Sequence, residues 1–477
     1  MRLNWPSIAA IAITGVCVWP SLAFAGRHVP HSKRLERALA SPKTATAKFA
    51  CETRFFDVSL NGGMPACYSP QSIRAAYGIN KLISAGATGA GQTIVIIDAF
   101  GSPTALQDLK DFDAKFGIPN PPSFRIVEMP GVPAFDGTDP NVIGWAQETS
   151  LDVQWSHAMA PNANIVLVVA KSNTDEDLLA ALNFAINKNL GDVISMSFGE
   201  SEAFLTDADG QAMLAQWEKA LRKARSRHIT VLASSGDEGS TTAIDDMGDV
   251  LGFKNVSYPG SSPNVTSVGG TDLMFGIGNK ADPAGKYLSE TVWNDEPQGF
   301  MGAGGGGVSM FFTRPDYQHH LGQQVRTALN GHRGIPDVSI NAGIVGGVVV
   351  NFGFLGTDSG FYIVGGTSVG AIEWAGIVAD LNQALNGRGI GFMNDKLYRI
   401  GRLGLHDDWF GRRLNLFHDI TVGNNGFCGF DAATFDLLCV DGFDATPGWD
   451  LATGWGTPNL GQLARLLDEL WNDDDRN

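Results

Sequence analysis

Short runs of β-branched and aliphatic residues alternate with helix-like stretches along most of the chain, a pattern typical of a parallel sheet with crossover helices. We expect strands at residues 93–98, 164–170, 192–198, 229–234, 265–268 and 348–352. We expect helices at residues 105–116, 145–159, 176–187, 211–226 and 367–385. No long low-complexity linker interrupts the pattern. The sequence therefore predicts a single α/β domain over residues 67–471, with a mainly parallel central sheet and helices on both faces.

The first 25 residues have the layout of a secretory signal peptide. Arg2 lies in a short basic region, residues 8–19 are mostly apolar, and Ala23-Phe24-Ala25 forms a small-residue cleavage pattern before Gly26. The apolar run is too short for a membrane span, and no later stretch approaches about 18 uninterrupted apolar residues. We therefore expect a secreted protein, extracellular or periplasmic.

Residues 26–66 are predicted to be a leader or linker. Within it, residues 26–50 carry six Lys or Arg side chains against one acidic residue, Glu36, whereas the whole chain has a net charge of −16. We call residues 26–50 the basic leader, and we interpret it as a flexible linker or as a remnant pro-segment. Residues 472–477 form an acidic tail. The negative overall charge argues against nucleic acid or an anionic membrane as the main partner.

Four cysteines remain once the signal peptide, with Cys17, is set aside. An even number in an oxidising compartment suggests two disulfides. Sequence proximity favours the pairs Cys51–Cys67 and Cys428–Cys439 among three possible pairings. Four free thiols are the alternative.

One serine lies in a setting that suits a nucleophile. Ser368 belongs to the run GGTSVGA at residues 365–371, between an apolar stretch and a helix-like stretch. A hydroxyl needs a base within hydrogen-bond reach and a group that orients the base. No histidine of the sequence is placed for this task, so we look to carboxylates.

Glu148 and Asp152 are four positions apart in a segment with helical periodicity, which stacks both acids on one helix face. A base and its orienting acid can therefore come from one helical turn. Asp237 follows a predicted strand and a tight turn. Taken separately, such an acid pair is more often a solvated helix face, Ser368 an N-cap and Asp237 a turn residue.

The order of several short motifs resembles the sedolisins, the serine-carboxyl peptidases with a subtilisin-like fold. These motifs are YSP at 68–70, AAYGI at 75–79, GQTIVIID at 91–98, LDVQWSHAMAP at 151–161, ISMSFG at 194–199, VGGT at 268–271, GGGVS at 305–309, PDYQ at 315–318 and PDVS at 336–339. Each motif alone is weak, but together they cover nearly everything from Tyr68 to Leu470. The resemblance implies that Ser368 is the nucleophile, Glu148 the general base, Asp152 the acid that orients Glu148, and Asp237 the oxyanion-hole acid. His157 is then structural.

The resemblance also implies one structural Ca²⁺ ion near the C terminus. Asp419 and Asp450 match its carboxylate ligands, and Ile420, Thr446 and Gly448 match its carbonyl ligands. Oxygen atoms in Gly-rich turns are the ligands that Ca²⁺ prefers. Two ordinary turns are the alternative.

The resemblance predicts a monomeric, acid-acting endopeptidase that takes protein or peptide substrates. A tripeptidyl-peptidase of the same family and a catalytically silent peptide-binding protein are the alternatives, and a subtilisin-type alkaline protease is disfavoured because the histidine motif is missing. Members of the family generally carry a long N-terminal prodomain, which we do not find between residue 26 and the peptidase-like region. We expect that the chain folds unaided, that the basic leader pairs with the acidic body in place of a prodomain, or that a separate chain does so.

Overall fold

The computed structural model describes residues 67–461 apart from 245–248, 277–284, 386–388, 405–416, 432–433 and 435, together with the backbone of four short strands nearer the N terminus. These four strands are β1 (Val29–Pro30), β2 (Lys33–Arg37), β3 (Phe55–Phe56) and β4 (Met64–Pro65). The signal peptide, most of the leader and the acidic tail lie outside the described residues. Within those residues, no helix combines the length and the apolar character that a membrane crossing requires.

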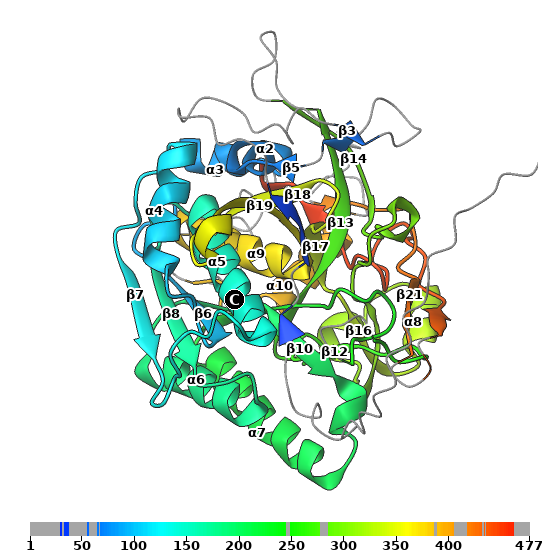
Figure 1. Ribbon diagram of the computed structural model, residues 1–477. Helices are drawn as coiled ribbons and strands as arrows, with labels where there is room; N and C mark the ends of the chain where they lie inside the picture. Colours follow the sequence, from blue (N-terminus) through cyan, green and yellow to red (C-terminus); the bar gives the residue numbers. More distant parts are fainter. Residues whose placement is uncertain are drawn as a thin grey trace, which may run out of the picture.

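The central sheet has the strand order β14-β13-β11-β9-β6-β8-β7, and β17 adds to β13 (Figure 1). Only β14 is antiparallel to its neighbour, so the sheet is mainly parallel. Its strands are β6 (Thr93–Ala99), β7 (Phe124–Glu128), β8 (Asn164–Ala170), β9 (Val193–Met196), β11 (Thr230–Ser234), β13 (Thr266–Gly276), β14 (Lys286–Val292) and β17 (Val338–Asn341).

Helices cover both faces of this sheet, as the sequence predicted. Side chains of β6 alternate: Ile94 and Ile96 enter one apolar cluster, while Val95 and Ile97 enter another on the opposite face. The first cluster joins the sheet to α5 (Pro140–Met159) and α9 (Thr367–Ala384), and the second joins it to α6 (Asp175–Lys188) and α7 (Ala208–Ser226). Figure 1 shows α5 and α9 at the centre of the view and α6 and α7 at its lower edge.

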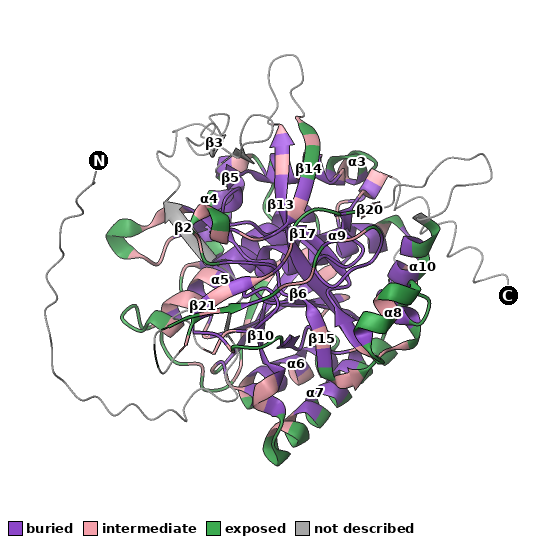
Figure 2. Ribbon diagram, turned by 90° about the vertical axis from the view of Figure 1, so that its right-hand side faces the viewer, coloured by how far each residue is buried: buried purple, intermediate pink, exposed green. Residues whose placement is uncertain are grey.

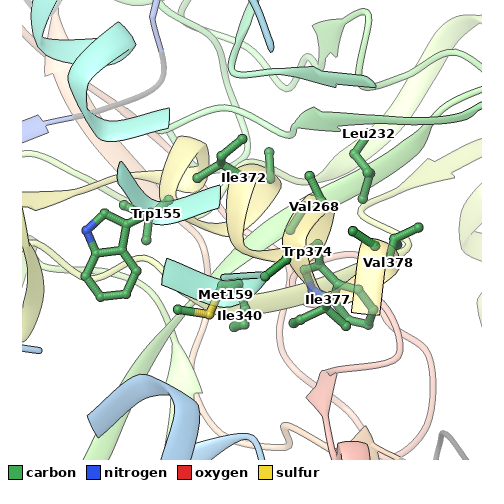
Figure 3. Close-up of a cluster of buried hydrophobic side chains, with 14 of the residues drawn as sticks. Trp155, Met159, Leu232, Val268, Ile340, Ile372, Trp374, Ile377 and Val378 are labelled. Carbon is green, nitrogen blue, oxygen red and sulfur yellow. The ribbon is translucent and has the colours of Figure 1, made fainter. Parts of the chain in front are cut away.

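The first cluster is the larger core and fixes the two central helices. Trp155 and Met159 of α5 and Ile372, Trp374 and Ile377 of α9 are fully buried in it (Figure 3). α9 is buried along almost its whole length, and α5 is buried from Glu148 to Met159. Figure 2 shows the buried interior at the centre of the molecule. Both helices therefore act as rigid supports for the polar side chains that they carry.

A second sheet corrects one prediction. Residues 348–352 do form a strand, β18 (Gly347–Phe352), but it is not part of the central sheet. It pairs antiparallel with β19 (Gly360–Gly365) and parallel with β5 (Cys67–Tyr68), in a sheet of order β2-β19-β18-β5. A local run of Val residues indicates a strand but not which neighbour it pairs with.

The remaining elements surround this framework. They are helices α2 (Pro70–Ala76), α3 (Ile79–Ser84), α4 (Ala105–Phe116), α8 (Gln323–Leu329) and α10 (Asn394–Gly404), and strands β10 (Phe198–Ser201), β12 (Ser257–Tyr258), β15 (Gly307–Thr313), β16 (His332–Ile335), β20 (Phe417–His418), β21 (Phe427–Phe430), β22 (Leu437–Val440) and β23 (Thr457–Pro458).

One of the two predicted disulfides is present within the described residues. Cys428 and Cys439 are bonded across the β21–β22 hairpin, with an S–S distance of 2.04 Å. Cys67 is also disulfide-bonded. Its expected partner, Cys51, lies outside the described residues.

Candidate active site

Ser368 sits at the start of a buried helix, where a strand of the second sheet ends. β19 ends at Gly365, and α9 begins at Thr367. The intervening Gly366 has φ = 117°, a conformation that a residue with a Cβ rarely adopts. The turn therefore requires glycine, and it directs the fully buried Ser368 into the interior at the N-terminal end of α9.

Two separate hydrogen bonds of Ser197, one to its backbone and one from its side chain, connect Ser368 with an acid on α5. The Ser368 hydroxyl donates to the carbonyl oxygen of Ser197 at 3.2 Å. The Ser197 hydroxyl in turn donates to Oδ1 of Asp152 at 3.0 Å. Ser197 lies between β9 and β10, so the structure joins α9, the central sheet and α5 at one point.

Glu148 and Asp152 both lie on α5 and are both fully buried. Burial is the main cause that raises the pKa of Asp152, and a hydrogen bond with Glu148 adds to the rise because that bond requires a proton on one of the two carboxyls. The structure therefore pairs these acids as their spacing predicted.

Asp98 joins this pair as a third acid, which sequence reasoning missed as a site residue. It lies near the carboxyl end of β6 and is fully buried. Burial raises its pKa to about 7, although a hydrogen bond with Thr149 opposes the rise. Burial also raises the pKa of Asp152 well above its usual range, and the charges of Asp98 and Glu148 raise it further. Such a cluster cannot ionise completely, so its members share protons.

Asp237 lies on the other side of the Ser368 turn. Its Oδ1 accepts hydrogen bonds from the backbone N–H and the hydroxyl of Thr367, both at 2.8 Å. Gly236, with φ = 115°, allows the sharp turn after β11 that brings Asp237 there. The carboxyl is thus fixed at the first turn of α9, one residue away from Ser368.

His157 does not belong to this group. It is buried on α5, where its Nε2 lies 2.7 Å from the carbonyl oxygen of Pro119 and 3.3 Å from a carboxylate oxygen of Asp113. These contacts hold α5 against the end of α4 and the loop that follows it.

The predicted calcium ligands come together at one turn. Both oxygens of Asp419 lie 3.1 Å from the backbone nitrogen of Gly448. Oδ2 of Asp450 accepts from the backbone N–H of Thr446 at 2.8 Å. Among the described residues, no group of three or more His, Cys, Asp or Glu side chains gathers to hold a metal. A cation here would therefore depend on backbone carbonyls, such as that of Ile420, in addition to the two carboxylates.

Two signals in the sequence could have led to the missed residues. Asp98 ends a predicted parallel strand, and the carboxyl ends of such strands are where ligands bind in open α/β sheets. Ser197 belongs to the motif at residues 194–199. Its role as a link between Ser368 and Asp152 depends on the strand order, which the motif alone does not reveal.

A match between this chain and a protein-family model agrees with this architecture. The model of the subtilase family matches residues 139–389, which is more than half of the chain. The chain belongs to the subtilase family. The match contains Glu148, Asp152, Asp237 and Ser368.

Similar proteins within this subtilase family confirm the predicted resemblance to the sedolisins. Kumamolisin from Bacillus sp. (strain MN-32) is 32% identical over 407 residues, which cover 84% of this chain and 64% of that protein. Sedolisin from Pseudomonas sp. (strain 101) is 29% identical over 388 residues, covering 80% and 59%. Human tripeptidyl-peptidase 1 is 31% identical over 342 residues, covering 67% and 51%. The chain thus spans about half to two thirds of the length of these relatives.

A solved structure confirms the subtilisin-like fold of this subtilase. The structure of Pseudomonas sedolisin, a serine-carboxyl proteinase in complex with two molecules of pseudo-iodotyrostatin, matches with a TM-score of 0.66 and 26% identity. The match covers 86% of this chain and 99% of that one.

Proposed function

We propose that the protein is a secreted serine-carboxyl peptidase that hydrolyses peptide bonds in acid, with Ser368 as the nucleophile. The observation that carries the proposal is the buried connection from the Ser368 hydroxyl through Ser197 to Asp152, because it places the serine among carboxyls. The relatives, which include a sedolisin and a tripeptidyl-peptidase, support the same activity.

In this proposal Glu148 is the general base and Asp152 carries the proton that orients it. A base must be ionised and yet retain affinity for a proton, and it works best when its pKa lies near the working pH. A histidine with a pKa near 6.5 is mostly protonated in acid, whereas a glutamate with a pKa near 4.3 is not. The raised pKa of Asp152 and its hydrogen bond with Glu148 keep the shared proton on this pair.

Asp237 has the opposite task. A tetrahedral intermediate carries a negative oxygen, which a protonated carboxyl at the first turn of α9 could stabilise by donating a hydrogen bond. The bonds from Thr367 to one oxygen of Asp237 hold the carboxyl in a fixed orientation for this purpose. Acid conditions favour the protonated form of Asp237. The same conditions suit Glu148 as the general base, so both roles are met in one range of pH.

The test is digestion of a denatured protein across pH 3–8 by the unaltered chain and by Ser368→Ala. We expect the unaltered chain to cleave in acid and Ser368→Ala to lose nearly all cleavage. The melting temperature of Ser368→Ala should equal that of the unaltered chain. Mass spectrometry of the products separates the alternatives, since an endopeptidase gives fragments of many lengths and a tripeptidyl-peptidase releases tripeptides. Absence of cleavage at every pH would instead favour the peptide-binding alternative.

The turn near the C terminus fits a structural Ca²⁺ ion, held by the carboxylates of Asp419 and Asp450 and by the carbonyls of Ile420, Thr446 and Gly448. Two carboxylates that converge on one Gly-containing turn supply hard oxygen ligands. Such an ion would tie the loop after β20 to the loop before β23. It would act on stability, with no part in the chemistry at Ser368.

Removal of the metal tests this site. We expect a calcium chelator to lower the melting temperature of the unaltered chain, because an ion that binds only the folded state stabilises it. Asp450→Asn should melt at a lower temperature and respond less to the chelator. Asp444→Asn changes an exposed acid of the same loop and should respond like the unaltered chain. A melting temperature that does not respond to the chelator in the unaltered chain would contradict the proposal.

A further inference from the structure

The turn that carries Ser368 rests on the loop that connects β17 to β18, residues 342–346. The carbonyl oxygen of Ala342 accepts a hydrogen bond from the backbone N–H of Gly366 at 2.6 Å, two positions before Ser368. A Cβ on the residue that precedes Gly366 would lie only 2.7 Å from the carbonyl oxygen of Gly343. A shift of this loop would therefore move the start of α9.

One buried acid holds the loop. Oδ2 of Asp295 accepts hydrogen bonds from the backbone N–H groups of Ile344 and Val345, at 2.6 and 3.3 Å. The same atom accepts from the indole N–H of Trp293 at 2.8 Å. Three donors on one oxygen stabilise an ionised carboxylate. Asp295 therefore suits the charged member of an acid pair.

A second buried acid, Asp272 on β13, lies against the same loop. A Cβ at Gly343 would lie 2.3 Å from Oδ1 of Asp272, so this carboxyl packs against the loop backbone. Its Oδ2 accepts from the backbone N–H of Asn294 at 3.2 Å, which ties Asp272 to the segment that carries Asp295. Within the described residues, the Oδ1 atoms of both acids lack a hydrogen-bond partner. One proton on the pair would therefore add a donor where buried oxygens have none.

The surroundings of the pair oppose a double negative charge. Burial raises the pKa of Asp272 well above its usual range, and the charges of Asp295 and Glu290 raise it further. Burial also raises the pKa of Asp295, although its three hydrogen bonds oppose the rise. Burial raises the pKa of Tyr68 as well, so this neighbour of Asp272 stays neutral. Residues 342–346 contain no titratable side chain.

We propose that Asp272 and Asp295 are positioning residues that share one proton and, in that state, hold the loop 342–346 under the turn of Ser368. Asp272 carries the proton, because three donors already stabilise the charge of Asp295. Without that proton, two carboxylates would repel each other in a dry interior, and the loop that both contact would move. The proposal rests on the proposed function, because it takes Ser368 as the nucleophile.

Backbone amide exchange of the loop tests the shared proton in chains that carry Ser368→Ala and do not digest themselves. Exchange is measured at pH 4 and pH 7, corrected for the chemical rate at each pH, with β6 as the reference for global unfolding. Asp272→Asn keeps the size of the side chain and an N–H donor but has no proton to lose. Asp380→Asn is the control, because it removes another buried acid with a raised pKa, whose charge partner is Arg74.

We expect the protection of the loop, relative to β6, to fall by at least about tenfold between the two pH values in the parent and in Asp380→Asn, the effect of one pKa unit. Asp272→Asn should keep its protection at both pH values. An equal loss in Asp272→Asn, or constant protection in the parent, would overturn the proposal.

The positioning role is tested by kinetics in the chain that retains Ser368. Asp295→Ala removes the acceptor for the loop and should lower kcat about 100-fold at pH 4 with KM nearly unchanged, since a misplacement of about 1 Å has that cost. Asp295→Asn keeps an oxygen that can accept the same N–H groups, so it should recover most of the kcat. Full kcat in Asp295→Ala, or equal losses in both variants, would contradict the role. If Asp295→Ala does not fold, the exchange measurement still decides.

Failure of the proposed function can be told apart from failure of this proposal. The exchange measurement needs no catalysis, whereas the proposed function is tested by digestion. A chain whose loop responds to Asp272→Asn as expected but which never cleaves protein would refute the activity and leave the shared proton standing. Cleavage in acid by a chain whose loop ignores this substitution would do the reverse.

Discussion

At the scale of single residues, the proposed chemistry requires Glu148 to be ionised while Asp152 and Asp237 hold protons. Asp152 is buried beside Glu148 and Asp98, and this raises its pKa well above the usual range. Asp237 accepts bonds from Thr367 at a helix N terminus, where the backbone N–H groups favour negative charge. Loss of the proton from Asp237 is therefore the step that we expect to end activity as the pH rises.

Substitution of Asp237 tests that expectation. Asp237→Asn keeps an N–H donor and an oxygen acceptor but no longer titrates, so cleavage should persist and should extend to higher pH. Asp237→Ala removes the donor and should cost about 2.7–4 kcal/mol of transition-state stabilisation, a loss of 100- to 1000-fold in kcat. The measurement is kcat against pH for both variants. A full kcat in Asp237→Ala would contradict an oxyanion-hole role.

At the scale of elements, the site depends on how closely α5 and α9 pack. Gly376 of α9 faces α5, and a Cβ at this position would clash with the Cβ of Met159 and lie 3.0 Å from the carbonyl oxygen of Ser156. The absence of a side chain therefore permits a close approach of the helices that carry Ser368 and its acids. Neither helix can shift far, because α9 is buried along nearly all of its length and α5 is buried from Glu148 to its C-terminal end.

A single methyl group should disturb this packing. Gly376→Ala is expected to destabilise the fold by about 1–3 kcal/mol, as overpacking of a core does, and to lower kcat by moving Ser368 relative to Glu148. Gly144→Ala on α5 is the matched control, because a Cβ there meets no atom within 4 Å. It should stabilise the helix by about 0.5–1 kcal/mol. Denaturant unfolding and kcat are measured for both, and a Gly376→Ala variant as stable as the parent would argue against close helix contact.

Elements of this kind were predictable from the sequence to different degrees. The predicted helices at 105–116 and 176–187 correspond to α4 and α6 within one residue, because their apolar periodicity is strong. The strand β7 was not predicted, since its side chains are exposed or half-buried and show no long apolar run. The candidate residues Ser368, Glu148, Asp152 and Asp237 were proposed from local motifs and the family resemblance, and their catalytic roles stay a prediction. The link through Ser197 and the third acid Asp98 needed the register of the sheet, which local patterns do not contain.

At the scale of the whole molecule, the interior holds many acids beyond the candidate site. Burial raises the pKa of Asp272, Glu373 and Asp380 well above the usual range and that of Asp108 to about 6. A raised pKa means that the folded state holds a proton that the unfolded state has already lost. These groups therefore make the fold most stable in acid, where both states are protonated.

The sign and range of this effect give a prediction for stability. Unfolded aspartates and glutamates titrate near pH 4, so stability should be highest at or below pH 4 and should fall as the pH rises to about 7. Asp108 alone, with its pKa raised from 3.8 to about 6, would account for roughly 3 kcal/mol of that loss. Thermal melting of Ser368→Ala between pH 4 and 7.5 measures the slope without self-digestion.

Substitution of one buried acid separates this cause from repulsion between surface charges. Asp108→Asn should flatten the decline of the melting temperature with pH, because the group that loses its proton is gone. Asp209→Asn removes an exposed charge from α7 and should leave the slope nearly unchanged. An equal effect of the two substitutions would assign the decline to the net charge of −16, and a melting temperature that rises toward neutral pH would exclude both causes.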